Sequence, residues 1–183
     1  RVLDEDLPRA LDVLTDLVRR PALRAADLEL ERKVVLEEIS TVEDTPDDLV
    51  FDPDGNLYVT EITEGRVSVR APDGKTRVLY GDLPCANPIT FHQGRLFAGE
   101  CRPGGRIMEL DLNGGAPRVL LDNVPMPNAM EVGPDGMLYF PVMGTNEIWR
   151  VGLDGGAPET VARDLGVPDA VKFDARGNLV STQ

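Results

Sequence analysis

Short alternating runs of hydrophobic and polar residues recur at a regular interval along most of the chain. Each repeat has a small residue or proline, then Asp or Asn, an apolar stretch, a turn that ends in Gly, and a second apolar stretch. The four copies are Pro46–Glu61, Ala86–Glu100, Pro127–Val142 and Pro168–Gln183. Two apolar runs around such a turn predict a β-hairpin, because Gly readily adopts the positive φ that tight turns need.

Two more short runs with strand character follow each of the first three hairpins. The third runs are Arg66–Arg70, Arg106–Leu110 and Glu147–Val151, and the fourth are Arg77–Tyr80, Arg118–Leu121 and Glu159–Ala162. Four strands within a period of about forty residues predict the blade of a β-propeller. We therefore expect a mainly β protein whose residues 46–183 form an incomplete propeller of three to four antiparallel four-stranded blades. A two-sheet sandwich of the same hairpins is the alternative, which the period disfavours.

The first 45 residues follow a different pattern. Apolar residues are spaced by four, three and four positions, as on one stripe of a helix, at Leu7, Leu11, Leu14 and Val18. Pro21 interrupts the pattern, and a second amphipathic stretch runs over residues 27–43. We predict an α-helical hairpin over residues 1–45, without catalytic residues. Such a pair must bury its apolar stripes against something else.

Composition excludes some partners. The net charge of −13 argues against nucleic-acid binding, which needs a surplus of Lys and Arg. No apolar run approaches the length of a membrane span, so we expect no membrane partner. Cys85 and Cys101 flank one predicted hairpin, where a disulfide and two free thiols both remain open.

An incomplete ring of blades leaves a strand edge and an apolar blade face uncovered. Three outcomes are possible: the helical hairpin covers that face, a homo-oligomer completes the ring, or the chain is only partly folded. We favour the first as a hypothesis, because the hairpin's apolar stripe and the blade face each need a partner. We expect the sequence to be part of a longer product.

One polar position recurs at the start of every repeat. Its occupants are Asp47, Asn87, Asn128 and Asp169, which lie 40, 41 and 41 residues apart. The innermost strands of a propeller begin near a common axis, so we expect these side chains to converge. Carboxylate and amide oxygens suit Ca²⁺ or another divalent cation. The structural alternative is that Asp and Asn beside Pro only form local turns.

The stretch DLPRALDVLTDLVRRPALRAADLELERKVVLEEISTVEDTPDDLVFD, over Asp6–Asp52, resembles the pitrilysin, insulinase and mitochondrial-processing-peptidase family of zinc proteases. The resemblance implies that Glu38 matches the third zinc ligand and that Glu31 supports the site. The family's other ligands come from an upstream H-x-x-E-H motif, which this sequence lacks; its only histidine is His92. An incomplete zinc protease is therefore the least favoured interpretation, because a zinc site needs three protein ligands.

From Pro46 onward the chain resembles the gluconolactonase/regucalcin family, on phrases such as PNAMEVGPDGMLYFPV and VPDAVKFDARGNLV. The resemblance implies calcium-dependent hydrolysis of a small lactone or sugar acid derivative. It implies metal ligation by Asn87, Asn128 and Asp169, with Asp169 also activating water. Asp47 would replace a family Glu that has no clear match here. A non-enzymatic propeller that binds a ligand or protein is the runner-up.

The segment TPDDLVFD fits both resemblances at the point where they meet. A natural or engineered recombination and an assembly artefact both account for such a join, and the sequence does not choose between them.

Overall fold

The computed structural model describes residues 48–183, which belong to one compact unit, Pro46–Gln183. The predictions made for residues 1–47, including the helical hairpin, Glu31, Glu38 and Asp47, lie outside the described residues. Within residues 48–183 every regular element is a strand. No helix in this part of the chain has the length and apolar character to cross a membrane.

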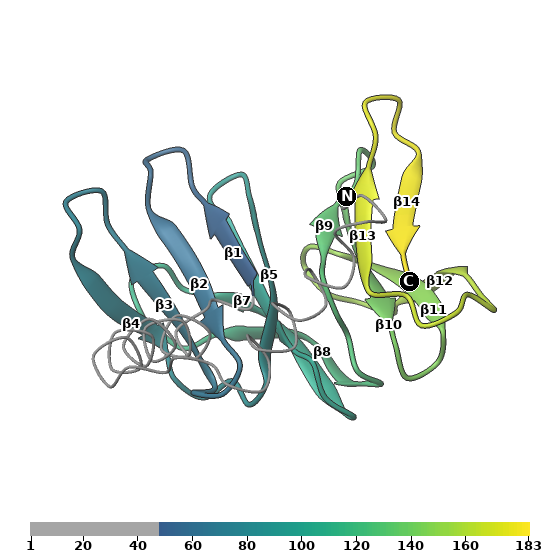
Figure 1. Ribbon diagram of the computed structural model, residues 1–183, viewed down its shortest axis with the longest axis horizontal. Helices are drawn as coiled ribbons and strands as arrows, with labels where there is room; N and C mark the ends of the chain where they lie inside the picture. The colour runs from purple at the N-terminus through teal and green to yellow at the C-terminus, as the bar shows by residue number, and fades with distance from the viewer. Residues whose placement is uncertain (1–47) are drawn as a thin grey trace, which may run out of the picture. The chain divides into compact units, whose positions relative to one another are not determined.

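The strands form three four-stranded antiparallel sheets and one two-stranded sheet (Figure 1). The first sheet contains β1 (Asp48–Phe51), β2 (Leu57–Glu61), β3 (Arg66–Arg70) and β4 (Thr76–Tyr80). The second contains β5 (Ala86–His92), β6 (Arg95–Glu100), β7 (Gly105–Leu110) and β8 (Arg118–Val124). The third contains β9 (Glu131–Val132), β10 (Met137–Val142), β11 (Glu147–Gly152) and β12 (Glu159–Ala162). The last hairpin is β13 (Ala170–Phe173) with β14 (Leu179–Thr182).

Each full sheet pairs its strands in chain order, as the blade of a propeller does. The first strands of successive sheets are neighbours: β1 lies against β5, β5 against β9, and β9 against β13. The mainly β propeller architecture predicted from the repeat is therefore present over the described residues, as three blades and half of a fourth.

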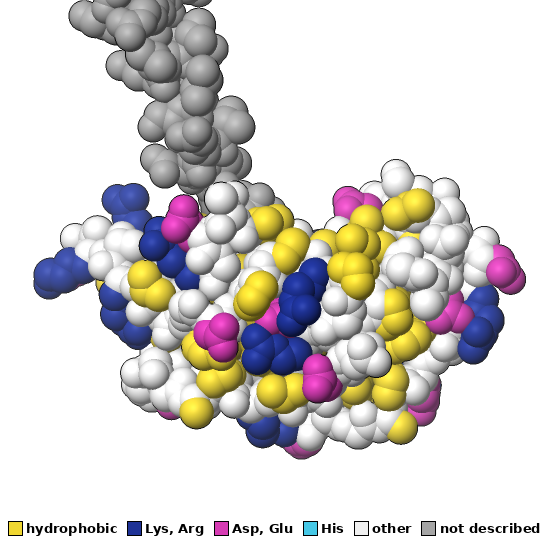
Figure 2. Space-filling model, turned by 90° about the horizontal axis from the view of Figure 1, so that it is seen from below, with side chains coloured by type: hydrophobic (Ala, Val, Ile, Leu, Met, Phe, Trp, Pro, Cys, Tyr) yellow, Lys and Arg dark blue, Asp and Glu magenta, His cyan; other side chains and the backbone are white. Residues whose placement is uncertain are grey.

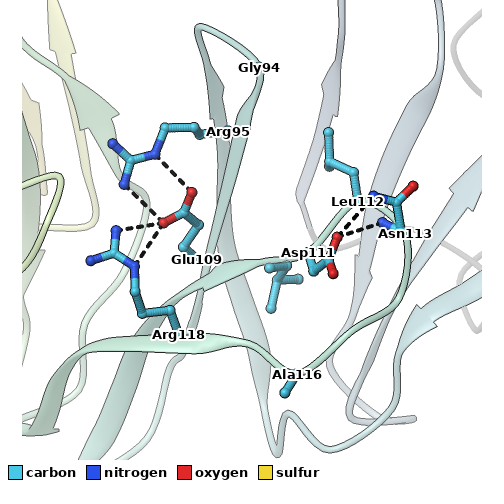
Figure 3. A pocket seen from close by; sticks show the side chains of 9 residues that line it. Gly94, Arg95, Glu109, Asp111, Leu112, Asn113, Ala116 and Arg118 are labelled. Atoms are coloured by element: carbon cyan, nitrogen blue, oxygen red, sulfur yellow. Dashed lines mark hydrogen bonds and ion pairs between the residues drawn. The ribbon is translucent and has the colours of Figure 1, made fainter.

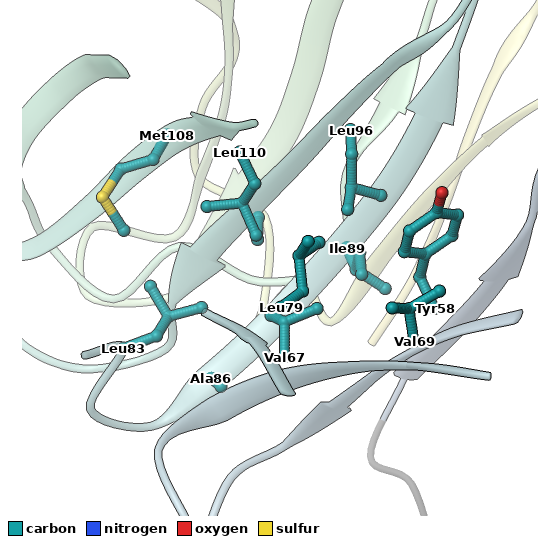
Figure 4. Packing of buried hydrophobic residues seen from close by; sticks show 11 residues of the cluster. Tyr58, Val67, Val69, Leu79, Leu83, Ala86, Ile89, Leu96, Met108 and Leu110 are labelled. Atoms are coloured by element: carbon teal, nitrogen blue, oxygen red, sulfur yellow. The ribbon is translucent and has the colours of Figure 1, made fainter. Parts of the chain in front are cut away.

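Hydrophobic residues between consecutive blades form the core. The cluster between the first two blades joins Tyr58, Val67 and Val69 of one sheet to Ile89 and Leu96 of the next (Figure 4). A second cluster, which includes Phe97, Ile107, Leu138 and Phe140, joins the second and third blades. Tyr139, Ile148 and Val171 are the buried centre of the third cluster, against the last hairpin. Burial between sheets therefore fixes the order in which the blades stack.

The recurring Asp-x-x-Gly-Asn turn has a local explanation. The Asp52 carboxylate accepts hydrogen bonds from the backbone amides of Asp54 at 3.0 Å and Asn56 at 2.8 Å. Gly55 between them has a φ of 82°, which favours glycine. Asp174 accepts the equivalent bonds from Arg176 and Asn178 in the last hairpin. These turns position the hairpins, so their carboxylates have a structural role.

Candidate functional site

The predicted metal-ligand positions lie where the inner strands begin, at the end of the blades that points downward in Figure 1. The backbone amide of Asn128 donates to the carbonyl of Pro141 at 3.1 Å, just ahead of β9. The amide of Asp169 donates to the carbonyl of Thr182 at 2.9 Å, just ahead of β13. Each residue is thus held by the second strand of its own blade.

Two of the predicted ligands meet across adjacent blades. The amide nitrogen Nδ2 of Asn128 donates a hydrogen bond of 2.7 Å to Oδ1 of Asp169. Asn128 is 8% exposed, whereas Asp169 is open to solvent. Because its nitrogen faces the carboxylate, Asn128 keeps its amide oxygen available to another partner. The contact between residues 41 positions apart is the convergence that the repeat predicts.

The other two predicted ligands are placed less closely. Asn87 occupies the equivalent position at the start of β5, before a cis peptide bond to Pro88. Within residues 48–183, no hydrogen bond joins the Asn87 side chain to Asn128 or Asp169. Asp47 lies outside the described residues. The structure therefore brings two of the four predicted residues into contact.

Asp48 is an inner-strand residue that sequence analysis missed. Its Oδ2 accepts a hydrogen bond of 3.2 Å from the backbone amide of Ile89, and so links the first two blades. Burial raises the pKa of the Asp48 carboxyl, and hydrogen bonds from the amides of Ile89 and Leu49 offset only part of that increase. The sequence signal for Asp48 was that two Asp residues stand side by side at the start of the first repeat. The strand register, in which Asp48 pairs with Thr60, is what shows where Asp48 lies.

Glu100, at the end of β6, is a carboxylate that the molecule buries completely, since its side chain is 0% exposed. It accepts hydrogen bonds from Arg106 Nε at 3.0 Å, the Arg106 backbone amide at 3.1 Å and Arg102 Nη2 at 2.8 Å. Burial raises the pKa of Glu100, but the hydrogen bonds and charges of the two arginines outweigh it, so the net pKa is lowered.

Figure 2 views this end of the molecule and shows Lys, Arg, Asp and Glu side chains gathered near the middle of the face. Arg102 and Arg106 are partly exposed, so the fully buried Glu100 lies beneath arginines that reach solvent. Glu61 is the weaker counterpart in the first blade, bound by Arg66 Nε at 2.7 Å and by Ser68. These ion pairs lie beside the candidate site and hold the ends of the second and third strands together.

The two cysteines lie at the same end of the second blade, where both are partly exposed and no disulfide joins them. The Cys101 amide donates to the Cys85 carbonyl at 2.9 Å, and the Cys85 thiol donates to the Cys101 carbonyl at 2.8 Å. Burial raises the pKa of Cys101 to about 11, with smaller contributions from Cys85 and from the charge of Asp169. Cys101 therefore lies within electrostatic reach of the Asn128–Asp169 pair.

Pockets occur at both ends of the blades. At the candidate end, residues 62–65 of the β2–β3 turn and residues 81–85, which lead from β4 to β5, line a pocket of about 370 Å³. At the other end, Arg95, Glu109 and Arg118 line a pocket of about 360 Å³ (Figure 3). These charged groups bind one another, with Arg95 Nε 2.8 Å and Arg118 Nη2 2.6 Å from Glu109. Both arginines also donate to the carbonyl of Leu153 in the third blade, which makes this pocket a blade-to-blade connection.

The candidate site offers oxygen ligands but no cluster of His, Cys, Asp and Glu side chains among the described residues. Among residues 48–183, no group of three His, Cys, Asp or Glu side chains is placed to bind a metal ion. The ligand atoms available on Asn87, Asn128 and Asp169 are oxygens, which suit Ca²⁺. The set lacks the Cys and His ligands of a structural zinc site. Calcium takes six to eight oxygens, so water or substrate would have to supply the others.

The described residues form successive four-stranded antiparallel blades, and the first strands of these blades lie next to one another. This arrangement defines them as part of a β-propeller. Virginiamycin B lyase from Staphylococcus aureus matches with a TM-score of 0.65 and 22% identity, over 75% of this chain and 48% of that structure. A gluconolactonase from Xanthomonas campestris matches with a TM-score of 0.61 and 22% identity, over 71% and 50%. A chain of a nidogen/laminin complex matches with a TM-score of 0.66 and 26% identity, over 74% and 56%.

The N-terminal stretch has a different likeness. Residues 1–56 match the family model of the insulinases, peptidase family M16. An uncharacterized zinc protease of Streptomyces coelicolor is 46% identical over 52 residues, which cover 28% of this chain and 11% of that protein. The β subunit of the human mitochondrial-processing peptidase is 38% identical over 52 residues, with the same coverage. The chain thus spans about a tenth of these relatives and about half of its propeller neighbours.

Both predicted resemblances are confirmed, each over its own part of the chain. The family match ends at residue 56, within the turn between β1 and β2. Residues 48–51 are therefore shared, since they match the protease family in sequence and form the first strand of a propeller blade.

Proposed function

We propose that the propeller part of this chain belongs to a divalent-cation-dependent hydrolase of small lactones or related esters. The hydrogen bond between Asn128 and Asp169 is the observation that carries the proposal, because it joins two oxygen-bearing residues from adjacent blades. The fold likeness to a gluconolactonase, whose name denotes action on a lactone, supports this substrate class.

The three residues have distinct roles in this proposal. Asn87 and Asn128 would offer amide oxygens to the cation, and Asp169 a carboxylate oxygen. A bound cation supplies Lewis acidity toward the carbonyl group of the substrate. Asn128, almost fully buried, holds the Asp169 carboxylate in place through its amide nitrogen. Asp169 is exposed and can accept a proton from a water molecule, as a general base does.

A complete ring is part of the proposal. The described residues supply three and a half blades, about half the length of the propeller neighbours. Additional blades or a second copy of the chain would have to supply the remaining walls of the site. The activity proposed here is therefore that of the completed propeller, with a small lactone or sugar acid derivative as its substrate.

Calcium titration by calorimetry and hydrolysis of a sugar lactone test this function. We expect millimolar or tighter Ca²⁺ binding by the chain, and loss of binding in Asp169→Ala and Asn128→Ala. Asp122→Ala is the matched control, because Asp122 is an exposed acid on β8 that bonds the backbone amide next to it. Equal calcium binding by Asp169→Ala and Asp122→Ala would refute the proposed ligand set.

A non-enzymatic binding module is the second candidate. The fold likeness to a chain of a nidogen/laminin complex favours it, because that complex joins two proteins. This function is the better one if millimolar Ca²⁺ does not bind and Asp169→Ala leaves lactone hydrolysis unchanged. A zinc protease is the third candidate, and it needs an H-x-x-E-H motif upstream of Arg1.

A further inference from the structure

Cys85 and Cys101 face each other at the open end of the β5–β6 hairpin. Ala86 pairs with Glu100 in the strand register, and the two cysteines are the next residues beyond the ends of these two strands. The Cys101 amide bonds the Cys85 carbonyl at 2.9 Å. This bond continues the hairpin pairing by one step beyond the Ala86–Glu100 pair. Opposite residues of regular antiparallel strands have Cα atoms about 4.5–5.5 Å apart, and a disulfide spans about 4.4–6.8 Å.

The side chains are directed suitably as well. The Cys85 thiol reaches across the pair to the carbonyl of Cys101 at 2.8 Å, so its sulfur already lies over the opposite residue. Cys85 has a φ of 58°, in the left-handed region that most residues avoid. Both residues are partly exposed, so a small reagent can reach them.

The third blade offers a comparison at the same position. The Met143 amide bonds the Met126 carbonyl at 3.0 Å, and Met126 has a φ of 62°. The cysteine pair thus has the same backbone hydrogen bond that closes the hairpin of the third blade. In the third blade two methionines occupy these positions, and they form no crosslink. A double replacement of the cysteines by methionine is therefore compatible with this closure.

We infer that Cys85 and Cys101 are a modification site, at which a small disulfide such as oxidised glutathione converts the two thiols into an intrachain disulfide. One protein sulfur attacks the glutathione disulfide, forms a mixed disulfide and releases one glutathione. The second protein sulfur then attacks the first, forms the Cys85–Cys101 bond and releases the other glutathione. The two protons lost by the protein thiols are taken up by the two glutathiones, which carry away two electrons.

The bridge would tie the start of β5, next to Asn87, to the end of β6 at the candidate end of the propeller. The inference does not rest on the proposed hydrolase function, since it needs only the hairpin geometry. Residues 85 and 101 lie 16 positions apart. Closing such a loop restricts the unfolded chain.

The test uses the whole reduced chain, incubated with oxidised glutathione, alkylated and digested with trypsin. Cleavage after Arg95 separates the cysteines into peptides 78–95 and 96–106, because Pro103 protects the bond after Arg102. We expect both thiols to resist alkylation, the intact mass to fall by two hydrogen atoms, and the two peptides to be linked. The Cys85→Met/Cys101→Met double variant should show no change in mass.

Three results would overturn the inference. They are thiols that remain open to alkylation, stable mixed disulfides with glutathione on the separate cysteines, and a crosslink between two chains on a non-reducing gel.

Discussion

Glu100 is the residue at which burial and charge compete most directly. Its carboxylate is fully buried and bound by Arg106 and Arg102, whereas Glu61 in the first blade is 24% exposed on its side chain. Removing one partner of a buried ion pair leaves the other charge uncompensated, which costs about 3–5 kcal/mol. Exposed pairs contribute less, at most about 1 kcal/mol.

We therefore expect Glu100→Gln to lower the free energy of unfolding by about 3 kcal/mol, and Glu61→Gln by about 1 kcal/mol or less. Urea denaturation of the two variants and the parent chain measures both values. Equal losses would show that burial does not distinguish the two carboxylates.

Glu109 provides the clearest pH dependence. Hydrogen bonds from Arg95 are the largest cause of the lowered pKa of Glu109, and hydrogen bonds from Arg118 add to them. Burial opposes this effect only in part, so the pKa falls from 4.5 to about 2. A carboxyl whose pKa is lower in the folded state stabilises the protein above its unfolded pKa. This contribution is lost as the pH falls from 4.5 to about 2.

The difference in Tm between the parent chain and Glu109→Gln should therefore be largest above pH 4.5 and shrink toward pH 2. Thermal unfolding across this range measures it. Glu64→Gln is the control, because Glu64 is exposed in the turn between β2 and β3. A Glu109→Gln difference that stays constant across the range would contradict the assignment.

At the residue scale, the repeat predicted the positions of Asn128 and Asp169 and their convergence, because a periodic backbone places equivalent residues on one ring. It did not predict Asp48 or the burial of Glu100. Each depends on which side of its strand the side chain points to, and the burial of Glu100 also depends on Arg102 in the following turn and Arg106 on β7. A one-residue shift in register would turn each side chain to the other face of its sheet, and a single sequence does not fix the register.

The strands themselves were predicted closely, because Gly-containing turns and short apolar runs are local signals. Arg66–Arg70 and Glu159–Ala162 match β3 and β12, and β8 extends three residues beyond its predicted end. The packing between elements was not predictable in the same way. Gly133 is an example: a Cβ atom there would meet Tyr139 Cε2 at 2.6 Å and Phe173 Cζ at 2.9 Å.

Gly133 therefore lets β13 approach the third blade. The rings of Tyr139 and Phe173 pack edge to face, with centroids 5.0 Å apart. We expect Gly133→Ala to lower the free energy of unfolding by about 1–3 kcal/mol, the usual cost of overpacking a core. Gly81→Ala should change it by less than about 0.5 kcal/mol, because its nearest atom is Val78 Cγ1 at 3.9 Å. Urea denaturation compares them, and equal effects would contradict the role of close packing.

For the whole molecule, sequence analysis predicted an incomplete propeller with uncovered faces. The first blade shows this directly. Leu49 is 48% exposed, whereas Ile89, Met130 and Val171 at the same position of the later blades are nearly or fully buried. Phe51, two residues further along β1, is 60% exposed. Each later residue packs against the preceding blade, and β1 has no described blade before it.

We propose that this face makes the chain self-associate, as burial of apolar surface drives most protein association. Sedimentation velocity over a range of protein concentrations should show a mass that rises with concentration. Leu49→Lys should reduce the rise, because it places a charge on the face. Val119→Lys is the matched control, since Val119 is also 48% exposed but lies on the outer strand β8. A monomer at every concentration, or equal effects of both substitutions, would show that the uncovered blade face does not recruit a second copy.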